Sequence, residues 1–278
     1  MSDIVIDQPV MVEADLTYLV PDGQRPYRYM YDPPTGVPRE GGTYRAHRVP
    51  IVNARVAAPP GGLSLDRNGF ELHAHKSALD DFSDARTIES VYYPESIELI
   101  KRLTGARRVV IFDHTLRDAD PATRPGNGHE PVKTIHNDQT FVSGPRRVRE
   151  LAPADEADEW LEGRTAIINL WRPIVAPVES SPLAMCDARS IAPGDLIPTD
   201  LHREDGTSGE VYTFAHNAQH RWYYFPRMTP GEVVLLKIFD SAEDGIARLT
   251  AHTAFEDPSS PADALPRKSI ELRTLVLF

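Results

Sequence analysis

Residues 108–117 read RVVIFDHTLR, a short apolar stretch with the extended pattern of a β-strand. Eight similar runs follow: VKTIHNDQTF (132–141), AIINLWRPI (166–174), PLAMCDARSI (182–191), VYTFAHN (211–217), RWYYFPRM (221–228), EVVLLKIFDS (232–241), IARLTAHTAF (246–255) and KSIELRTLVLF (268–278). Clusters of Pro, Gly, Asp and Ser separate the nine runs. Short strands spaced in this way are typical of an antiparallel sandwich or barrel. The sequence therefore predicts a mostly β fold with a few flanking helices.

Two helical segments are expected beside these strands. The stretch SIELIKRLTG (96–105) has apolar residues at helical spacing and places Gly105 where a C-cap would lie. Within PRRVRELAPADEADEWLEGR (145–164), ADEADEW begins after a proline and gathers its apolar residues on one side. We expect a single helix there, interrupting the array of strands.

The chain of 278 residues is long enough for a sizeable core, and we expect one domain over residues 1–278. Its first 60 residues are rich in Pro, Gly, Tyr and Arg, and turn signals such as PPTG and APPGG separate short extended pieces. Residues 1–107 are therefore expected to form an N-terminal wrap and helices, and residues 108–278 the β core.

Composition excludes several classes of partner. A net charge of −11, from 41 acidic and 30 basic residues, argues against nucleic acid as the main partner, because such binding depends on Lys and Arg. The single cysteine, Cys186, forms no intramolecular disulfide. No leader sequence is evident, and no stretch approaches the roughly 20 apolar residues of a membrane span. We expect a cytoplasmic protein without membrane contact; its oligomeric state stays open.

The stretch KTIHNDQTF (133–141) places an imidazole and a carboxylate two positions apart. Side chains at i and i+2 of a strand project from the same face, so His136 and Asp138 point together while Asn137 points away. One imidazole and one carboxylate begin the 2-His-1-carboxylate set that binds Fe(II) and leaves positions free for other ligands. This set needs a second histidine from elsewhere in the chain.

Four distal histidines are candidates, and their surroundings differ. His202 lies in the polar stretch TDLHREDG, while His216 and His220 bound AHNAQH, which is typical of a turn between strands. His252 lies in the apolar stretch LTAHTAFEDP, which suits a buried and fixed ligand. We therefore favour His252.

Fifteen residues after His252, the sequence PRKSIELR places Arg267 and Ser269 in an R-x-S arrangement. A guanidinium presents two parallel N–H donors to a carboxylate, and a hydroxyl on the same strand face can donate a further bond. The order HxD, distal His, R-x-S matches what a β-sandwich needs to hold Fe(II) and 2-oxoglutarate: three protein ligands, an anchor for a dicarboxylate and a position for O₂.

On these motifs, the sequence resembles the Fe(II)- and 2-oxoglutarate-dependent oxygenases, which have a double-stranded β-helix (jelly-roll) fold. Within them it is similar to the branch of the cephalosporin 7α-methoxylase component, gibberellin desaturase-like proteins and fungal endoperoxide-forming oxygenases. The stretches that carry this likeness are FDHTLR (112–117), HNDQT (136–140), NLWRPI (169–174), PLAMCDARSI (182–191), WYYFPRMTPGEVVLLKIFDS (222–241), HTAFEDP (252–258) and RKSIELR (267–273). They span most of the expected β core.

The resemblance implies that His136, Asp138 and His252 bind Fe(II), with O₂ and 2-oxoglutarate as co-substrates. It also implies that Arg267 and Ser269 bind the distal carboxylate of 2-oxoglutarate. Arg172 of NLWRPI is a second candidate for that carboxylate or for an acidic substrate. Arg273 has the same strand parity as Arg267 and is a third.

The implied activity is oxidation of a small molecule of the secondary-metabolite type by hydrogen abstraction, giving hydroxylation, desaturation, cyclisation or peroxidation. Two other classes stay open on the residues alone. One is a Zn- or Mn-dependent β-barrel hydrolase or isomerase that uses the same three ligands without 2-oxoglutarate. The other is a jelly-roll binding protein in which HxD is incidental.

Overall fold

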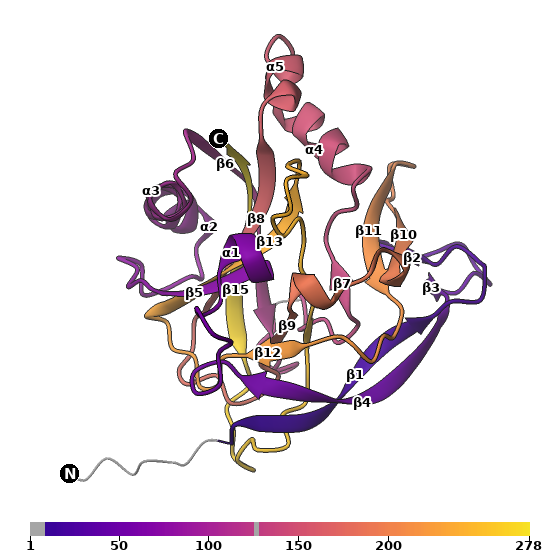
Figure 1. Ribbon diagram of the computed structural model, residues 1–278, viewed down its shortest axis with the longest axis vertical. Coiled ribbons are helices and arrows are strands. Elements are labelled where there is room, and N and C mark those ends of the chain that lie inside the picture. The colour runs from indigo at the N-terminus through magenta and orange to yellow at the C-terminus, as the bar shows by residue number, and fades with distance from the viewer. Residues whose placement is uncertain (1–8, 125–127) are drawn as a thin grey trace.

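The computed structural model describes residues 9–124 and 128–278, and its strands form two curled sheets (Figure 1). The larger sheet has the order β1-β4-β12-β9-β14-β7-β11-β10-β2-β3. Its strands are β1 (Met11–Val20), β2 (Tyr27–Tyr29), β3 (Glu40–Gly41), β4 (Thr43–Asn53), β7 (His136–Asn137), β9 (Leu183–Cys186), β10 (Leu196–His202), β11 (Ser208–Phe214), β12 (Trp222–Tyr224) and β14 (His252–Ala254).

The smaller sheet has the order β5-β13-β8-β15-β6. Its strands are β5 (Phe70–Ala74), β6 (Arg108–Asp118), β8 (Thr165–Pro173), β13 (Glu232–Asp240) and β15 (Lys268–Leu277). Each of the nine predicted runs overlaps one of the observed strands, so the prediction of a mostly β fold is confirmed. Four of the runs keep only short strands: β7, β9, β12 and β14 have two, four, three and three residues.

The core lies between the two sheets. Trp171 of β8 and Leu236 of β13, from the smaller sheet, pack in one buried cluster with Leu183 and Met185 of β9 and Tyr223 of β12, from the larger. Aromatic and aliphatic side chains on facing sheets exclude water from the space between them, and this burial of apolar area stabilises the fold.

The outer face of the smaller sheet is covered by α3 (Tyr93–Thr104), the longest helix in the described residues (Figure 1). Leu99 and Ile100 of α3 pack against Leu170 of β8 and Leu272 of β15. Gly105 ends the helix at a φ of 74° and donates its N–H to the carbonyl of Lys101. The predicted helix over residues 96–105 is confirmed. Shorter helical turns are α1 (Leu65–Asn68), α2 (Ala85–Thr87), the π-helix η1 (Ile88–Tyr92) and the 3₁₀ turns η2 (Ala188–Ser190) and η3 (Pro193–Asp195).

The single helix expected within residues 145–164 is in fact two, α4 (Ser143–Leu151) and α5 (Ala157–Glu162). The break follows from Pro153, because a residue that precedes proline is driven out of the helical region. Ala152 accordingly has φ −72° and ψ 146°. Val148 of α4 and Trp160 of α5 still reach the core between the sheets.

The expected N-terminal wrap is instead part of the sheets. Strands β1 and β4, of ten and eleven residues, pair along their whole length and form the long ribbon at the lower edge of Figure 1. β4 continues the larger sheet by parallel pairing with β12, and β5 pairs with β13 in the smaller sheet. Within the described residues, no helix has the length and apolar character needed to cross a membrane.

Candidate metal and co-substrate site

His136 and His252 lie opposite each other on neighbouring strands. β7 pairs with β14 through these two residues, and their ring centroids are 4.4 Å apart. The flanking strands, β11 beside β7 and β9 beside β14, hold this pair in the middle of the larger sheet. Two histidines far apart in the sequence therefore meet through ladder pairing.

Asp138 completes a group of three potential ligands. It follows β7 by one residue, and its Oδ1 lies 3.5 Å from Nε2 of His136. One ligand atom from each of His136, Asp138 and His252 lies within 4.8 Å of the others, and this is the one group of its kind found among the described residues. The side chains at i and i+2 converge as expected, even though the strand itself ends at Asn137.

The other distal histidines lie elsewhere. His220 is buried between Asp195, whose Oδ2 is 3.0 Å from its Nε2, and the hydroxyl of Tyr18. His216 stacks on His47 with ring centroids 3.9 Å apart. His202 ends β10, where it pairs with Tyr29 of β2 and Ser208 of β11, and is not in the polar loop that the sequence suggested.

Hydrogen bonds orient two of the ligands. Nδ1 of His136 lies 2.9 Å from the carbonyl oxygen of Thr134, which fixes Nδ1 as the protonated nitrogen and leaves Nε2 free for a metal. Oδ2 of Asp138 accepts from Nδ2 of Asn169 at 2.9 Å and from Nε of Arg273 at 3.1 Å. These bonds occupy one carboxylate oxygen and leave Oδ1 directed toward the histidines.

Charge and burial keep the group in the protonation state that metal binding requires. Burial, and then the neighbouring His252, lower the pKa of His136 to about 4, and burial also lowers the pKa of His252. Burial alone would raise the pKa of the Asp138 carboxyl, but Arg273 and the two imidazoles outweigh it and hold that pKa well below its usual range. At neutral pH the site offers two neutral imidazoles and one carboxylate.

A pocket beside the two histidines contains a buried cation. It is lined by His136, His252, Trp171 and Arg267, with Arg117, Glu271, Val132, Leu183, Thr253 and Ala254. Arg267 is only 2% exposed; its Nη1 donates to the carbonyl of Ser181 at 2.6 Å, and its Nε has no partner among the described residues. Burial, followed by the charge of Arg117, lowers the pKa of Arg267 to about 9.

Ser269 also lacks a partner. Its hydroxyl is buried and makes no hydrogen bond with any described residue. Arg267 and Ser269 project from the same face at the start of β15, as the R-x-S spacing predicts. A buried guanidinium nitrogen and a buried hydroxyl that both lack a partner are costly to keep, unless an anion brings acceptors to them.

The second candidate, Arg172, is not part of this pocket. It lies one residue after Trp171 on β8, so it points to the opposite face of the smaller sheet. There its guanidinium donates to the hydroxyl of Tyr92 at 2.9 Å and to the carbonyls of His75 and Pro230. Its Nη2 lies 2.6 Å from Nδ1 of His75, so each of its three nitrogens has a partner within the protein.

The third candidate, Arg273, is already paired with carboxylates. Besides its bond to Asp138, it contacts Asp113 at 2.6 Å and Glu271 at 2.9 Å. Sequence analysis missed this role, and it missed Asn169 entirely. Alternation along the strands could have placed both residues on the side that faces the site. Asn169 shares a face with Trp171 on β8, and Arg273 shares a face with Ser269 on β15.

Comparison with known proteins shows the family. A family model described as "Oxidoreductase/YMDC permease-like domain" matches residues 16–277. The hydroxylase/desaturase efuI of Hormonema carpetanum is 33% identical over 251 residues, which cover 82% of this chain and 83% of efuI. The Fe(II)/2-oxoglutarate-dependent dioxygenase nvfI of Aspergillus novofumigatus is 30% identical over 284 residues, covering 95% and 96%. The chain belongs to the Fe(II)/2-oxoglutarate-dependent dioxygenases.

A solved structure of a member of this family has the same fold. The iron- and alpha-ketoglutarate-dependent endoperoxidase NvfI superposes with a TM-score of 0.86 and 28% identity, covering 96% of this chain and 98% of that chain. This match confirms the predicted jelly roll and the resemblance to the branch that contains fungal endoperoxide-forming oxygenases. It supports the dioxygenase class and not the hydrolase alternative.

Proposed function

We propose that this dioxygenase binds Fe(II) through His136, Asp138 and His252, and that Arg267 and Ser269 bind the distal carboxylate of 2-oxoglutarate. The observation that carries the proposal is a buried guanidinium, with no partner at its Nε among the described residues, in the same pocket as the two histidines. An oxygenase of this kind needs an anion site at a short distance from its metal, because one dicarboxylate must reach both.

The residues fit the metal as well as the co-substrate. Two imidazoles and one carboxylate are the facial set of non-haem Fe(II) oxygenases, in which other coordination positions stay open. Thr134 sets the tautomer of His136, and Asn169 and Arg273 hold one oxygen of Asp138. Such outer hydrogen bonds raise affinity by placing each ligand before the metal arrives.

When bound, the iron supplies the oxidative chemistry, in which 2-oxoglutarate is converted to succinate and CO₂ and O₂ is consumed. This chain positions the reactants and shields them. Arg267 orients the co-substrate through its far carboxylate, and Trp171, whose ring lies 5.5 Å from the Arg267 guanidinium, keeps water from that ion pair.

The family acts on small molecules, and we propose a substrate of the secondary-metabolite type. Relatives are named as hydroxylase/desaturases and as an endoperoxidase, which supports hydrogen abstraction as the shared step. The net charge of −11 supports a partner other than nucleic acid, and the single cysteine supports a reducing compartment such as the cytoplasm. Because strands from both halves of the chain build the two sheets, we also propose that the chain is one domain.

The test is an anaerobic titration of metal-free protein with Fe(II) and then with 2-oxoglutarate, followed in the visible region. We expect the weak charge-transfer band of a keto acid chelated to Fe(II), and its loss in His136→Ala. His216→Ala removes an imidazole outside the site and should keep the band. A band that survives in His136→Ala would contradict the metal site, and bound Fe(II) without any band would contradict the co-substrate.

A further inference from the structure

A second pocket reaches Asp138 from another side. Its walls are α4 and the hairpin of β10 and β11. It is lined by Asp138, Gln139, Ser143, Arg146, Arg147, Glu150, Leu201, Arg203, Ser208, Gly209, Glu210 and Val211. The pocket that holds Arg267 contains the two histidines but not Asp138, so the two pockets meet the metal-binding group through different ligands.

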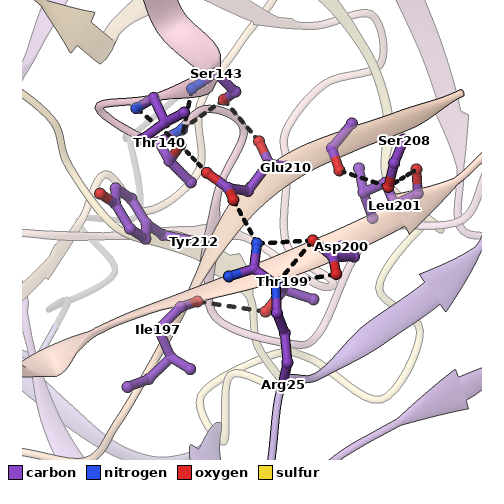
Figure 2. Close-up of polar contacts among 12 residues, drawn as sticks. Arg25, Thr140, Ser143, Ile197, Thr199, Asp200, Leu201, Ser208, Glu210 and Tyr212 are labelled. Carbon is purple, nitrogen blue, oxygen red and sulfur yellow. Dashed lines mark hydrogen bonds and ion pairs between the residues drawn. The ribbon is translucent and has the colours of Figure 1, made fainter.

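The hairpin is tied to the segment that follows Asp138 (Figure 2). Glu210 of β11 accepts one hydrogen bond from the hydroxyl of Thr140 and another from Arg25, which also binds Asp200 of β10 at 2.7 Å. The hydroxyl of Ser143 donates to the carbonyl of Glu210 at 2.7 Å. The wall of this second pocket therefore has a defined position relative to Asp138.

Each acidic residue that lines the second pocket has an arginine partner. Glu210 pairs with Arg25, Asp138 with Arg273, and Glu150 with Arg147 at 2.9 Å. Arg25 and Arg273 come from outside the pocket and also pair with carboxylates there. The other two arginines of the pocket lining take no part in these ion pairs.

These two arginines are Arg146 and Arg203. Neither forms an ion pair within the described chain; Arg146 donates to the carbonyl of Ser208 at 3.3 Å, and Arg203 to the hydroxyl of Thr207 at 3.4 Å. Asp205, close to Arg203 in the hairpin turn, is itself held by Thr207. Among the described residues, the hydrogen-bond acceptors of the two guanidiniums are therefore neutral groups.

Both guanidiniums lie around the start of β11. Arg146 contacts Ser208 there, and a Cβ added to Gly209 would lie 3.0 Å from Nη2 of Arg203. The absence of a side chain at Gly209 therefore gives Arg203 its place against the strand. A carboxylate at this point can accept from both arginines, since each presents a fork of N–H donors.

We propose that this pocket is the substrate side of the site, and that Arg146 and Arg203 bind a carboxylate of the small-molecule substrate. The inference rests on the proposed function, because it assigns the other pocket to 2-oxoglutarate. The proposed substrate is a small organic acid. Its carboxylate binds in the α4–hairpin pocket, and its reacting carbon points toward Asp138.

The test uses protein loaded anaerobically with Fe(II) and saturating 2-oxoglutarate, so that the first anion site is filled. Three matched pairs of probes are titrated by calorimetry: cyclohexanecarboxylate, benzoate and 2-naphthoate, each against its neutral amide. We expect at least one carboxylate to bind about tenfold or more tightly than its amide. Arg146→Met and Arg203→Met should each remove most of this preference.

Two further variants sharpen the comparison. Arg149→Met is the matched control, because Arg149 is exposed on the same helix and pairs with Asp158 at 3.0 Å, outside the pocket. It should keep the preference for the carboxylate. Gly209→Ala keeps every charge but displaces Nη2 of Arg203, and should reduce the preference.

The failure of this inference is distinguishable from failure of the proposed function. The charge-transfer band of bound 2-oxoglutarate is recorded for every protein before the probes are added. No band in the wild type would overturn the proposed function. A normal band with no preference for any carboxylate, or with a preference that survives in both Arg146→Met and Arg203→Met, would overturn the α4–hairpin pocket alone.

Discussion

Replacing Arg267 with methionine should separate binding from stability. Methionine has a similar length and no charge, so Arg267→Met removes the guanidinium from the pocket and leaves an apolar side chain beside Trp171. In the unliganded protein, the guanidinium has one hydrogen bond, to the Ser181 carbonyl, and no partner at Nε among the described residues. The Arg267 charge is therefore buried without an ion-pair partner among the described residues.

The expected loss of affinity is large. A hydrogen bond to a charged group contributes about 1.5–3 kcal/mol, and a carboxylate of 2-oxoglutarate can accept two from Arg267. At the lower limit the loss is about 3 kcal/mol, and each 1.4 kcal/mol is about a factor of ten. The 2-oxoglutarate concentration at half-saturation should therefore rise about a hundredfold or more.

The expected effect on unfolding has the opposite sign. Desolvating the Arg267 charge costs several kcal/mol, while the Ser181 bond and the contact with Trp171 together return about 2 kcal/mol. The free energy of unfolding of metal-free Arg267→Met should thus equal or exceed that of the wild type. The variant should also lose the stabilisation that 2-oxoglutarate gives the metal-loaded protein, which is about 2.7 kcal/mol at a ligand concentration of 100 times Kd.

Arg172 provides the matched control, since it is an equally buried arginine on a different face of the smaller sheet. Arg172→Met leaves the carbonyls of His75 and Pro230 without a donor and should destabilise the protein by about 3 kcal/mol or more. Its half-saturation for 2-oxoglutarate should stay unchanged. Thermal melts with Mn(II) in place of Fe(II), with and without 2-oxoglutarate, measure both effects. Unchanged affinity in Arg267→Met, or destabilisation equal to that of Arg172→Met, would refute this argument.

Three further predictions concern the ligands and the cysteine. His252→Ala should abolish tight Fe(II) binding with unchanged far-ultraviolet circular dichroism; a full equivalent of iron after gel filtration would contradict it. Arg273→Met removes one of two donors to Asp138 and should weaken metal affinity about 10- to 100-fold, measured by chelator competition; unchanged affinity would show that Arg273 does not hold the carboxylate. Burial raises the pKa of Cys186 to about 12, so at pH 8 the reactive thiolate is scarce and the native protein should resist a thiol reagent until it is unfolded. Rapid labelling without denaturant would disprove the burial.

Local sequence predicted the parts of the site that depend on short-range geometry. The i, i+2 spacing of His136 and Asp138 sets their common direction, and the same spacing sets that of Arg267 and Ser269. The apolar surroundings of His252 distinguished it from three other histidines before any strand pairing was known. These predictions hold because a strand places alternate side chains on one face, whichever strands it pairs with.

Only the tertiary structure distinguished among the three candidate arginines for the carboxylate of 2-oxoglutarate. Arg172, Arg267 and Arg273 are all buried or nearly so, and nothing adjacent to them in sequence says which one keeps a nitrogen without an acceptor. Pairing of β15 with β8 puts Arg273 against Asn169, and the neighbouring loop after β7 brings Asp138 to both. The local sequence pattern also did not predict the helix break at Pro153 or the long strands β1 and β4. Turn-forming residues around these elements dominated that pattern.

By itself, the sequence determined the mostly β class, the candidate ligands and the anion anchor, since each follows from residue type and alternation within a few positions. Only the tertiary structure decided which histidine faces His136, which arginine keeps an unpaired nitrogen in the pocket of the two histidines, and that α4 and the β10–β11 hairpin form a second pocket beside Asp138. The physical reason is that strand pairing is selected by the burial of whole sheets, so the partner of a side chain depends on residues a hundred or more positions away.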